Sequence, residues 1–165
     1  MRKRVVGCRP RDPSPAAQLW LDLESLAQVE VTSEDADHSI ESALIPSAGS
    51  GWRAAQSGEQ MIRLLLDEPL RLRRIFLEFH EDEQERTQEF VLRWSPDRGQ
   101  SYRELLRQQY NFSPPDTTRE VEDYEVNLDG VTALEDGVTA LELRIVPDIH
   151  GGSVRASLAQ LRLAS

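Results

Sequence analysis

The chain has 165 residues, of which 39% are hydrophobic and 29% charged, and this composition is typical of one globular domain rather than a disordered or fibrous chain. Its 29 acidic side chains outnumber the 19 Lys and Arg, and the net charge of −10 argues against nucleic acid as a main partner, because phosphates would be repelled. No run approaches the roughly 18 apolar residues of a membrane helix, so we expect no membrane partner.

The cellular compartment is predicted from two features. The single cysteine, Cys8, has no intramolecular disulfide partner, so the cysteine content does not indicate an oxidising compartment. The sequence VVGC at 5–8 matches a lipoprotein cleavage box only superficially, because a signal peptide needs an apolar core of about seven or more residues before it. We therefore expect a cytoplasmic protein.

Residues 1–27 are predicted to form an N-terminal arm with a short helix, and residues 28–165 to form the folded domain. Three prolines and no hydrophobic period in 1–17 are typical of an irregular arm. From Gln18 to Ala27 apolar residues recur at helical spacing. Trp20 in this segment is expected to pack against the domain rather than bind a ligand.

The next segment is predicted to hold one short strand and one long connection. Alternating valines predict the strand over 28–33. Turn-forming residues without a period predict an irregular connection up to Gly51, packed by Ile40, Leu44 and Ile45. His38 lies in this connection and is interpreted as a hydrogen-bonded loop residue rather than a metal ligand.

Three strands with short connections are predicted over 58–69, 71–80 and 87–95, with an acidic corner at 81–86, and this spacing is typical of an antiparallel meander. Each strand has one apolar face with a period of two, and the same period returns at 124–128, 141–145 and 159–163. Such faces need a second sheet to cover them. We therefore predict an all-β, two-layer antiparallel β-sandwich.

One short segment is duplicated. The residues DGVTALE at 129–135 are repeated without change at 136–142. Because seven is odd, an insertion inside a strand would turn every following side chain to the wrong face. We expect the copy to lie mostly in the connection before Leu141, as a neutral loop extension.

Several landmarks together resemble the discoidin or coagulation-factor type C domain family. They are Trp52 ahead of a strand ending in DEP, the corner FVLRWSPDRGQSY at 90–102, the late strand LELRIVPD at 141–148 and a final ASLAQLRL. The resemblance covers about residues 28–165. It implies a galactose-binding-like jelly roll and a non-catalytic module whose end loops hold a sugar, a lipid head group or a protein surface.

The resemblance also bears on cofactors. Members of that family usually carry an Asp-rich calcium loop before the tryptophan and a glutamate in the last strand. This chain has IPSAGSGW at 45–52 and Gln160 in those places. Calcium needs several oxygen ligands with carboxylates among them. We therefore expect no cofactor and do not favour calcium.

The candidate ligand-binding residues are expected in loops at one end of the sandwich. The segment RQQYNFSPP at 107–115 is predicted to be a loop that combines amides with aromatic rings, and this combination recognises carbohydrate through hydrogen bonds and stacking. In sugar-binding members of the family an Asn beside an aromatic residue, an Arg and often a His form the site. The candidates are Arg86, Asn111, Tyr110, Phe112, Gln109, His80, Trp52 and His150.

Each candidate has an alternative structural role. The loop at 107–115 could be packed by its own side chains, and the acidic corner could be a solvated turn. Arg86 could simply pair with a neighbouring acid, and Trp52 could plug the sandwich. The glycines after His150 fit a turn with positive φ as well as a contact loop.

The expected function is that of a binding protein and not of an enzyme. No G-x-S-x-G, P-loop, H-E-x-x-H, C-x-x-C or dinucleotide motif occurs in the sequence. We favour a stand-alone module that binds carbohydrate or a glycan-like ligand. The alternative is an intracellular protein–protein docking domain of the same fold. The sequence leaves the ligand and the oligomeric state open.

Overall fold

The computed structural model describes residues 20–46, 50–126 and 137–165. Two short helices, α1 (Leu23–Leu26) and α2 (Glu41–Leu44), lie beside the strands. The strands are β1 (Ala27–Val31), β2 (Trp52–Ser57), β3 (Gln60–Leu70), β4 (Arg74–His80), β5 (Arg86–Ser95), β6 (Arg103–Phe112), β7 (Arg119–Glu125), β8 (Val138–Val146), β9 (Arg155–Leu158) and β10 (Gln160–Ala164). No helix in this part of the chain is long and apolar enough to cross a membrane.

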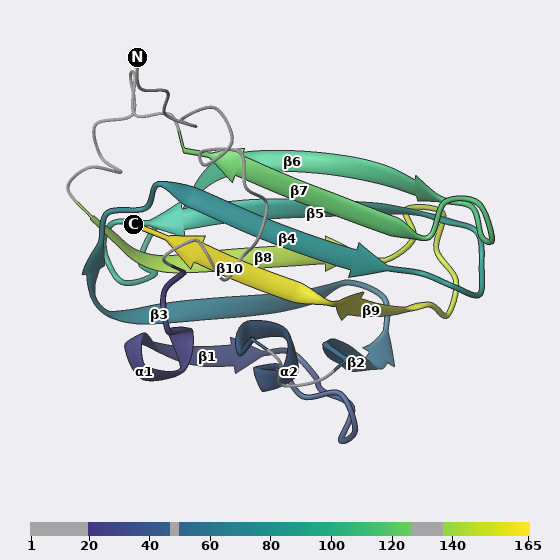
Figure 1. The fold of residues 1–165 in the computed structure, drawn as a ribbon, viewed down its shortest axis with the longest axis horizontal. Helices are drawn as coiled ribbons and strands as arrows, with labels where there is room; N and C mark the ends of the chain where they lie inside the picture. The colour runs from purple at the N-terminus through teal and green to yellow at the C-terminus, as the bar shows by residue number, and fades with distance from the viewer. Residues whose placement is uncertain (1–19, 47–49, 127–136) are drawn as a thin grey trace, which may run out of the picture.

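The strands form two facing antiparallel layers (Figure 1). The larger sheet has the order β1-β3-β8-β5-β6, and the facing sheet has the order β10-β4-β7. Strands β2 and β9 form a separate pair, and β9 continues the line of β10 (Figure 1). The predicted two-layer antiparallel sandwich is therefore confirmed.

The predicted meander is wrong in its pairing. Strand β3 pairs with β1 and β8, β4 pairs with β10 and β7, and β5 pairs with β8 and β6, so these three consecutive strands do not pair with one another. The chain changes sheet at 71–73 and again at 81–85. A period of two shows which face of a strand is buried, but it does not show which strand lies beside it.

The predicted core faces are confirmed. Side chains from β4 and β5 face each other between the sheets, and the rings of Phe79 and Phe90 lie 5.3 Å apart. The residues Ile75, Leu77, Phe79, Phe90, Leu92, Trp94, Leu141, Leu143 and Ile145 are all buried. This contiguous apolar layer is the main source of stability, because it removes large aliphatic and aromatic surfaces from water.

The N-terminal helix is shorter than predicted. Only Leu23–Leu26 is helical, because the Leu21 amide donates to the Leu163 carbonyl (2.8 Å) and β1 already begins at Ala27. Trp20 packs as expected, with its ring 6.3 Å from that of Phe76 on β4. Gln18 and Leu19 lie outside the described residues, and the boundary at 27/28 remains a prediction.

The long connection after β1 carries the predicted packing residues. Ile40 and Leu44 are buried in the core, as expected, whereas Ile45 is half-buried. Helix α2 forms within this connection and was not predicted. A single turn of four residues has too little hydrophobic period to be recognised in the sequence.

The duplicated segment enters strand β8 earlier than predicted. The second copy is in strand from Val138 onwards. The first copy lies outside the described residues, so the expectation that the added seven residues lie mostly in the connection stays a prediction. Val138 and Leu141 are both buried although they are three residues apart. In this region the pairing of β3 with β8 shifts register, because the extra residues between Leu65 and Leu70 lie on β3.

Candidate functional site

Three loops meet at one end of the sandwich, at the right in Figure 1. They join β4 to β5 (81–85), β6 to β7 (113–118) and β8 to β9 (147–154). Two adjoining hollows lie among them, and we name them the Asn111 hollow and the His80 hollow. Loops at the end of a rigid sandwich are well placed to carry a binding site.

The Asn111 hollow has a volume of about 400 Å³ and brings together the three segments that the sequence singled out. It is lined by Glu85, Arg86, Thr87, Asn111, Phe112, Ser113, Asp148 and His150. Four of the eight candidates therefore share one concavity. Most of its lining is polar.

Arg86 is a buried side chain of this hollow, at 4% exposure. Its Nε donates to Glu81 (2.6 Å), and its Nη1 donates to the Pro147 carbonyl (2.7 Å) and to Gln88 (3.1 Å). The guanidinium lies 4.7 Å above the Phe112 ring. Arg86 thus pairs with an acid and also lines the hollow, and no hydrogen bond within the described residues uses its Nη2.

The acidic corner is an organised turn around Glu81. The backbone amides of Glu83 (2.9 Å) and Gln84 (3.2 Å) donate to Oε2 of Glu81, while Arg86 donates to Oε1. Burial alone would raise the pKa of the Glu81 carboxyl, but the Glu83 amide and the Arg86 guanidinium hold that pKa below its ordinary value. Glu81 therefore stays ionised and fixes both the turn and Arg86.

The remaining polar groups of the hollow offer both donors and acceptors. The Thr87 hydroxyl donates to Oδ1 of exposed Asn111 (2.7 Å), and no hydrogen bond in the described part of the chain uses the Asn111 side-chain amide nitrogen. Asp148 accepts from the backbone amide of His150 (3.1 Å), whose imidazole is 75% exposed. Gly151 and Gly152 follow with φ of +88° and +105°, which glycine tolerates best.

The aromatic candidates do not offer a stacking surface. Phe112 is fully buried beneath Arg86, and the Tyr110 hydroxyl donates to the Arg119 carbonyl (2.8 Å). Gln109 donates to Glu89 (3.0 Å), and neither Tyr110 nor Gln109 lines a hollow of the loop end. These three side chains serve packing and strand pairing.

The predicted loop at 107–115 is wrong for most of its length, because β6 extends to Phe112. Strand β6 is the edge of the larger sheet, and most of its side chains are exposed. An edge strand of this kind can be polar on its solvated side without losing its pairing on the other side. Polar composition alone therefore suggested a loop where the chain is extended.

The His80 hollow has a volume of about 420 Å³ and lies on the other side of the acidic corner. It is lined by His38, Ser50, Trp52, Arg53, residues 80–84, residues 153–155 and residues 157–159. Trp52 is 1% exposed and its indole nitrogen donates to the Ser33 carbonyl (3.1 Å), so it plugs the sandwich beneath this hollow.

His80 is held by a hydrogen bond to Glu78. Its Nε2 lies 2.5 Å from Glu78, which also accepts from Nε of Arg119 (2.9 Å). Burial would raise the pKa of the Glu78 carboxyl, but hydrogen bonds from Arg119 and His80 hold that pKa below its ordinary value. The His80 ring is half-exposed at the edge of the hollow.

The structure adds three residues that the sequence did not single out as site residues. His38, Arg53 and Arg155 line the His80 hollow, and Asp35 contacts both His38 (3.9 Å) and Arg155 (3.4 Å). One indication of a site here was present in the sequence, the length of the connection that holds His38, because long ordered loops are often functional. Arg155 lies far away in the chain, so its approach depended on the pairing of β2 with β9.

The two hollows share a wall. Glu81 lines the His80 hollow and Arg86 lines the Asn111 hollow, and the 2.6 Å ion pair between them separates the two. Across the described residues, no group of three or more His, Cys, Asp or Glu side chains is placed to hold a metal ion. The expectation of no cofactor remains a prediction.

Solved structures identify the fold. A carbohydrate-binding module, CBM32-5 from Clostridium perfringens in complex with GalNAc-β-1,3-galactose, matches with a TM-score of 0.62 and 16% identity over 88% of this chain and 99% of that one. The CBM32 of AlyQ, in complex with 4,5-unsaturated mannuronic acid, matches with a TM-score of 0.57 and 16% identity over 89% and 98%. Reduced XRCC1, bound to the DNA pol beta catalytic domain, matches with a TM-score of 0.59 and 17% identity over 85% and 96%.

These likenesses show that the chain has the galactose-binding-like, discoidin-type jelly-roll fold, so the predicted fold class is confirmed. No protein-family model matches the chain. No curated protein matches its sequence.

Proposed function

We propose that this protein is a non-catalytic module that binds carbohydrate at the loop end of its sandwich. One observation carries the proposal. Three loops meet around two adjoining polar hollows, and the ion pair between Glu81 and Arg86 lies between the two hollows. Several of the solved structures with this fold are carbohydrate-binding modules, which supports the same conclusion.

The chemistry of the Asn111 hollow suits a hydroxylated ligand. A sugar hydroxyl both donates and accepts, and the hollow offers the Asn111 amide as a donor and the Asp148 and Glu85 carboxylates as acceptors. Arg86 is neutralised by Glu81, so Asp148 and Glu85 leave the hollow with an excess of negative charge. A neutral sugar therefore suits it better than an acidic one.

A glycan array followed by titration calorimetry tests this proposal. Asn111→Ala and His150→Ala should each weaken binding of an array hit by about fivefold or more, since one hydrogen bond contributes about 1 kcal/mol. Gln109→Ala, on the same strand as Asn111 but outside both hollows, is the matched control and should leave affinity unchanged. An array without hits, or unchanged affinity in the Asn111 and His150 variants, would contradict the proposal.

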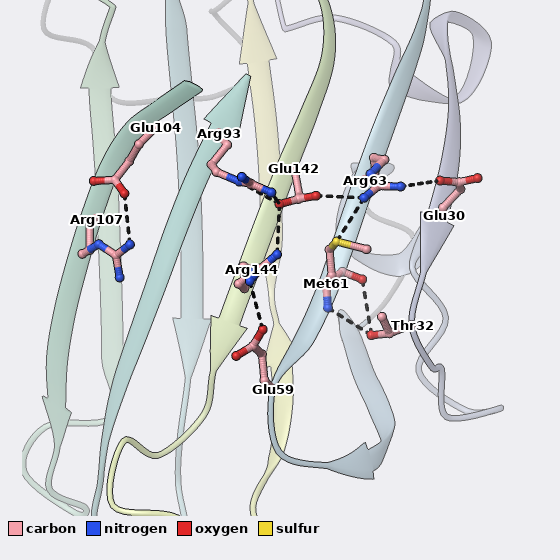
Figure 2. Close-up of polar contacts among 10 residues, drawn as sticks. All are labelled: Glu30, Thr32, Glu59, Met61, Arg63, Arg93, Glu104, Arg107, Glu142 and Arg144. Atoms are coloured by element: carbon pink, nitrogen blue, oxygen red, sulfur yellow. Dashed lines mark hydrogen bonds and ion pairs between the residues drawn. The ribbon is translucent and has the colours of Figure 1, made fainter. Parts of the chain in front are cut away.

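A second candidate function, protein docking, is favoured by the outer face of the larger sheet. Figure 2 shows a row of alternating charge across four neighbouring strands, made of Glu30, Arg63, Glu142 and Arg93. Glu142 is 1% exposed because Arg63 (2.9 Å), Arg93 and Arg144 (3.6 Å) surround it. Interfaces are enriched in arginine, and side chains that are already fixed lose little entropy on binding.

Competition separates the two functions. If this face docks a protein, Arg107→Glu should reduce recovery of one defined partner in a pull-down, and sugars should not compete with that partner. If the loop end binds glycan as proposed, Arg107→Glu should leave glycan affinity unchanged, because Arg107 lies on the outer face with Glu89 and Glu104.

A further inference from the structure

A continuous line of polar side chains crosses the interior of the sandwich behind the Asn111 hollow. Gln88 on β5 accepts from Nη1 of Arg86 (3.1 Å), and its amide donates to Oε1 of Glu120 on β7 (3.1 Å). Gln88 and Glu120 are 0% and 1% exposed. Because β5 and β7 belong to different sheets, the hydrogen bond between them spans the core.

A second group of polar side chains lies towards the edge of the sandwich. The Glu122 carboxyl, on the same strand, contributes to the raised pKa of Glu120, but Oε2 of Glu120 is buried without a hydrogen-bond partner among the described residues. The Tyr124 hydroxyl donates to Glu122 (2.9 Å) and accepts from the Gln108 amide (3.0 Å). Gln108 is exposed on the edge strand β6. Hydrogen bonds thus join Arg86, Gln88 and Glu120 in the interior, and join Glu122, Tyr124 and Gln108 near the β6 and β7 edges.

This arrangement is costly for a core. Glu120 lies directly opposite Phe79 in the pairing of β7 with β4, where the surrounding layer is aromatic and aliphatic. Burying an amide and a carboxyl there costs free energy that apolar side chains of the same size would not, unless every polar atom is satisfied. A role for the polar pair in placing Arg86 explains why the interior is polar at this position.

We propose that Gln88 and Glu120 are positioning residues that fix the Arg86 guanidinium so that its Nη2 is presented to the Asn111 hollow. Gln88 and Pro147 occupy Nη1 and Glu81 occupies Nε, so only Nη2 is left without a partner among the described residues. A donor held in this way loses little entropy when it binds a ligand oxygen. The ligand half of this proposal rests on the proposed carbohydrate function.

The charge state of Glu120 agrees with this role. Burial first, and then the Glu122 carboxyl, raise the pKa of Glu120 to about 9, so its carboxyl is neutral at pH 7. A neutral Glu120 accepts from Gln88 without attracting the guanidinium away from Glu81. The charged groups facing it are Arg86 from β5 and Glu122 from its own strand, while Phe79 on β4 is apolar.

The positioning role is tested without any ligand by arginine side-chain NMR. In the full chain, Arg86 should give two resolved Nη signals, because bonds at Nε and Nη1 slow rotation of the guanidinium, and Arg86→Lys assigns these signals by their loss. Gln88→Leu removes one of the two bonds at Nη1, and Glu120→Leu leaves Gln88 without its partner, so both should speed the exchange between the two signals, whereas Glu120→Gln should keep the wild-type exchange rate. Gln60→Leu removes another buried glutamine, one that contacts Thr32 and Ser33, and should leave the exchange rate unchanged. A wild-type exchange rate in Gln88→Leu, or faster exchange in Gln60→Leu, would overturn the proposal.

A second arm links positioning to binding, with galactose as the probe. Gln88→Leu should weaken galactose binding by about fivefold, while Gln60→Leu should leave it unchanged. Equal weakening in both variants would show a merely structural effect and overturn the role in binding. If wild-type protein binds neither galactose nor any array glycan, the proposed function fails, and the NMR result still decides whether Gln88 and Glu120 orient Arg86.

Discussion

Replacing Glu120 with glutamine should stabilise the protein above pH 5. Burial raises the folded-state pKa of Glu120 from 4.5 to about 9, so the protonated form is favoured on folding. The stability of that form is fully present below pH 4.5 and is lost as the pH rises towards 9. Glutamine keeps the hydrogen bond from Gln88 but has no proton to lose, so Glu120→Gln escapes this loss.

The size of the effect follows from the shift. Each pH unit between the unfolded and the folded pKa costs about 1.4 kcal/mol, and pH 7 lies about 2.5 units above the unfolded value, so the wild type should lose about 3 kcal/mol by then. Urea unfolding monitored by the fluorescence of the buried Trp52 and Trp94 measures this difference.

The measurement needs three pH values and one control. At pH 5 the two proteins should differ little, and the advantage of Glu120→Gln should grow at pH 7 and again at pH 8.5. Glu104→Gln removes a half-exposed glutamate of β6 and should show no such trend. A stability difference between Glu120→Gln and wild type that is constant from pH 5 to pH 8.5 would refute the reasoning.

Three further predictions follow from the same structure. Glu142→Leu should lower the free energy of unfolding by about 1–2 kcal/mol in urea titration, because Arg63 and Arg93 lose their shared partner but still reach water. Phe79→Ala should cost about 3–5 kcal/mol in the same assay, since it opens a cavity against Phe90; a loss below about 1 kcal/mol would show that the sheets do not pack there. Mannuronic acid should bind about tenfold or more weakly than galactose by calorimetry, because the loop-end hollows carry more carboxylates than cations; equal affinity would contradict this charge argument.

The layers of the fold were predictable, whereas the order of the strands was not. The period of two in β4, β5 and β8 identified the buried faces, because side chains alternate strictly along a strand. Pairing partners depend on contacts between distant segments, because β3 and β5 both pair with β8, and β4 pairs with β10. Short connections looked like hairpins although they carry the chain between sheets.

The candidate site was predicted in its position but less well in its residues. Arg86, Asn111 and His150 share one hollow. This could be predicted because the family resemblance indicated that their segments lie at the same end of the sandwich. Residue type could not show that Phe112 is buried under a cation or that Trp52 is a plug, since aromatic side chains suit both a core and a binding surface. Gln88 and Glu120 escaped notice because polar residues within a strand usually face solvent.

The most direct test of the central claim is an NMR titration of the ¹⁵N-labelled full chain with galactose. The structure predicts that amide signals shift at Thr87, Asn111, Ser113, Asp148 and His150, the lining of the Asn111 hollow, together with neighbours across the Glu81–Arg86 wall. Saturable shifts confined to the outer face of the larger sheet, around Arg93 and Arg144, would contradict a carbohydrate site at the loop end.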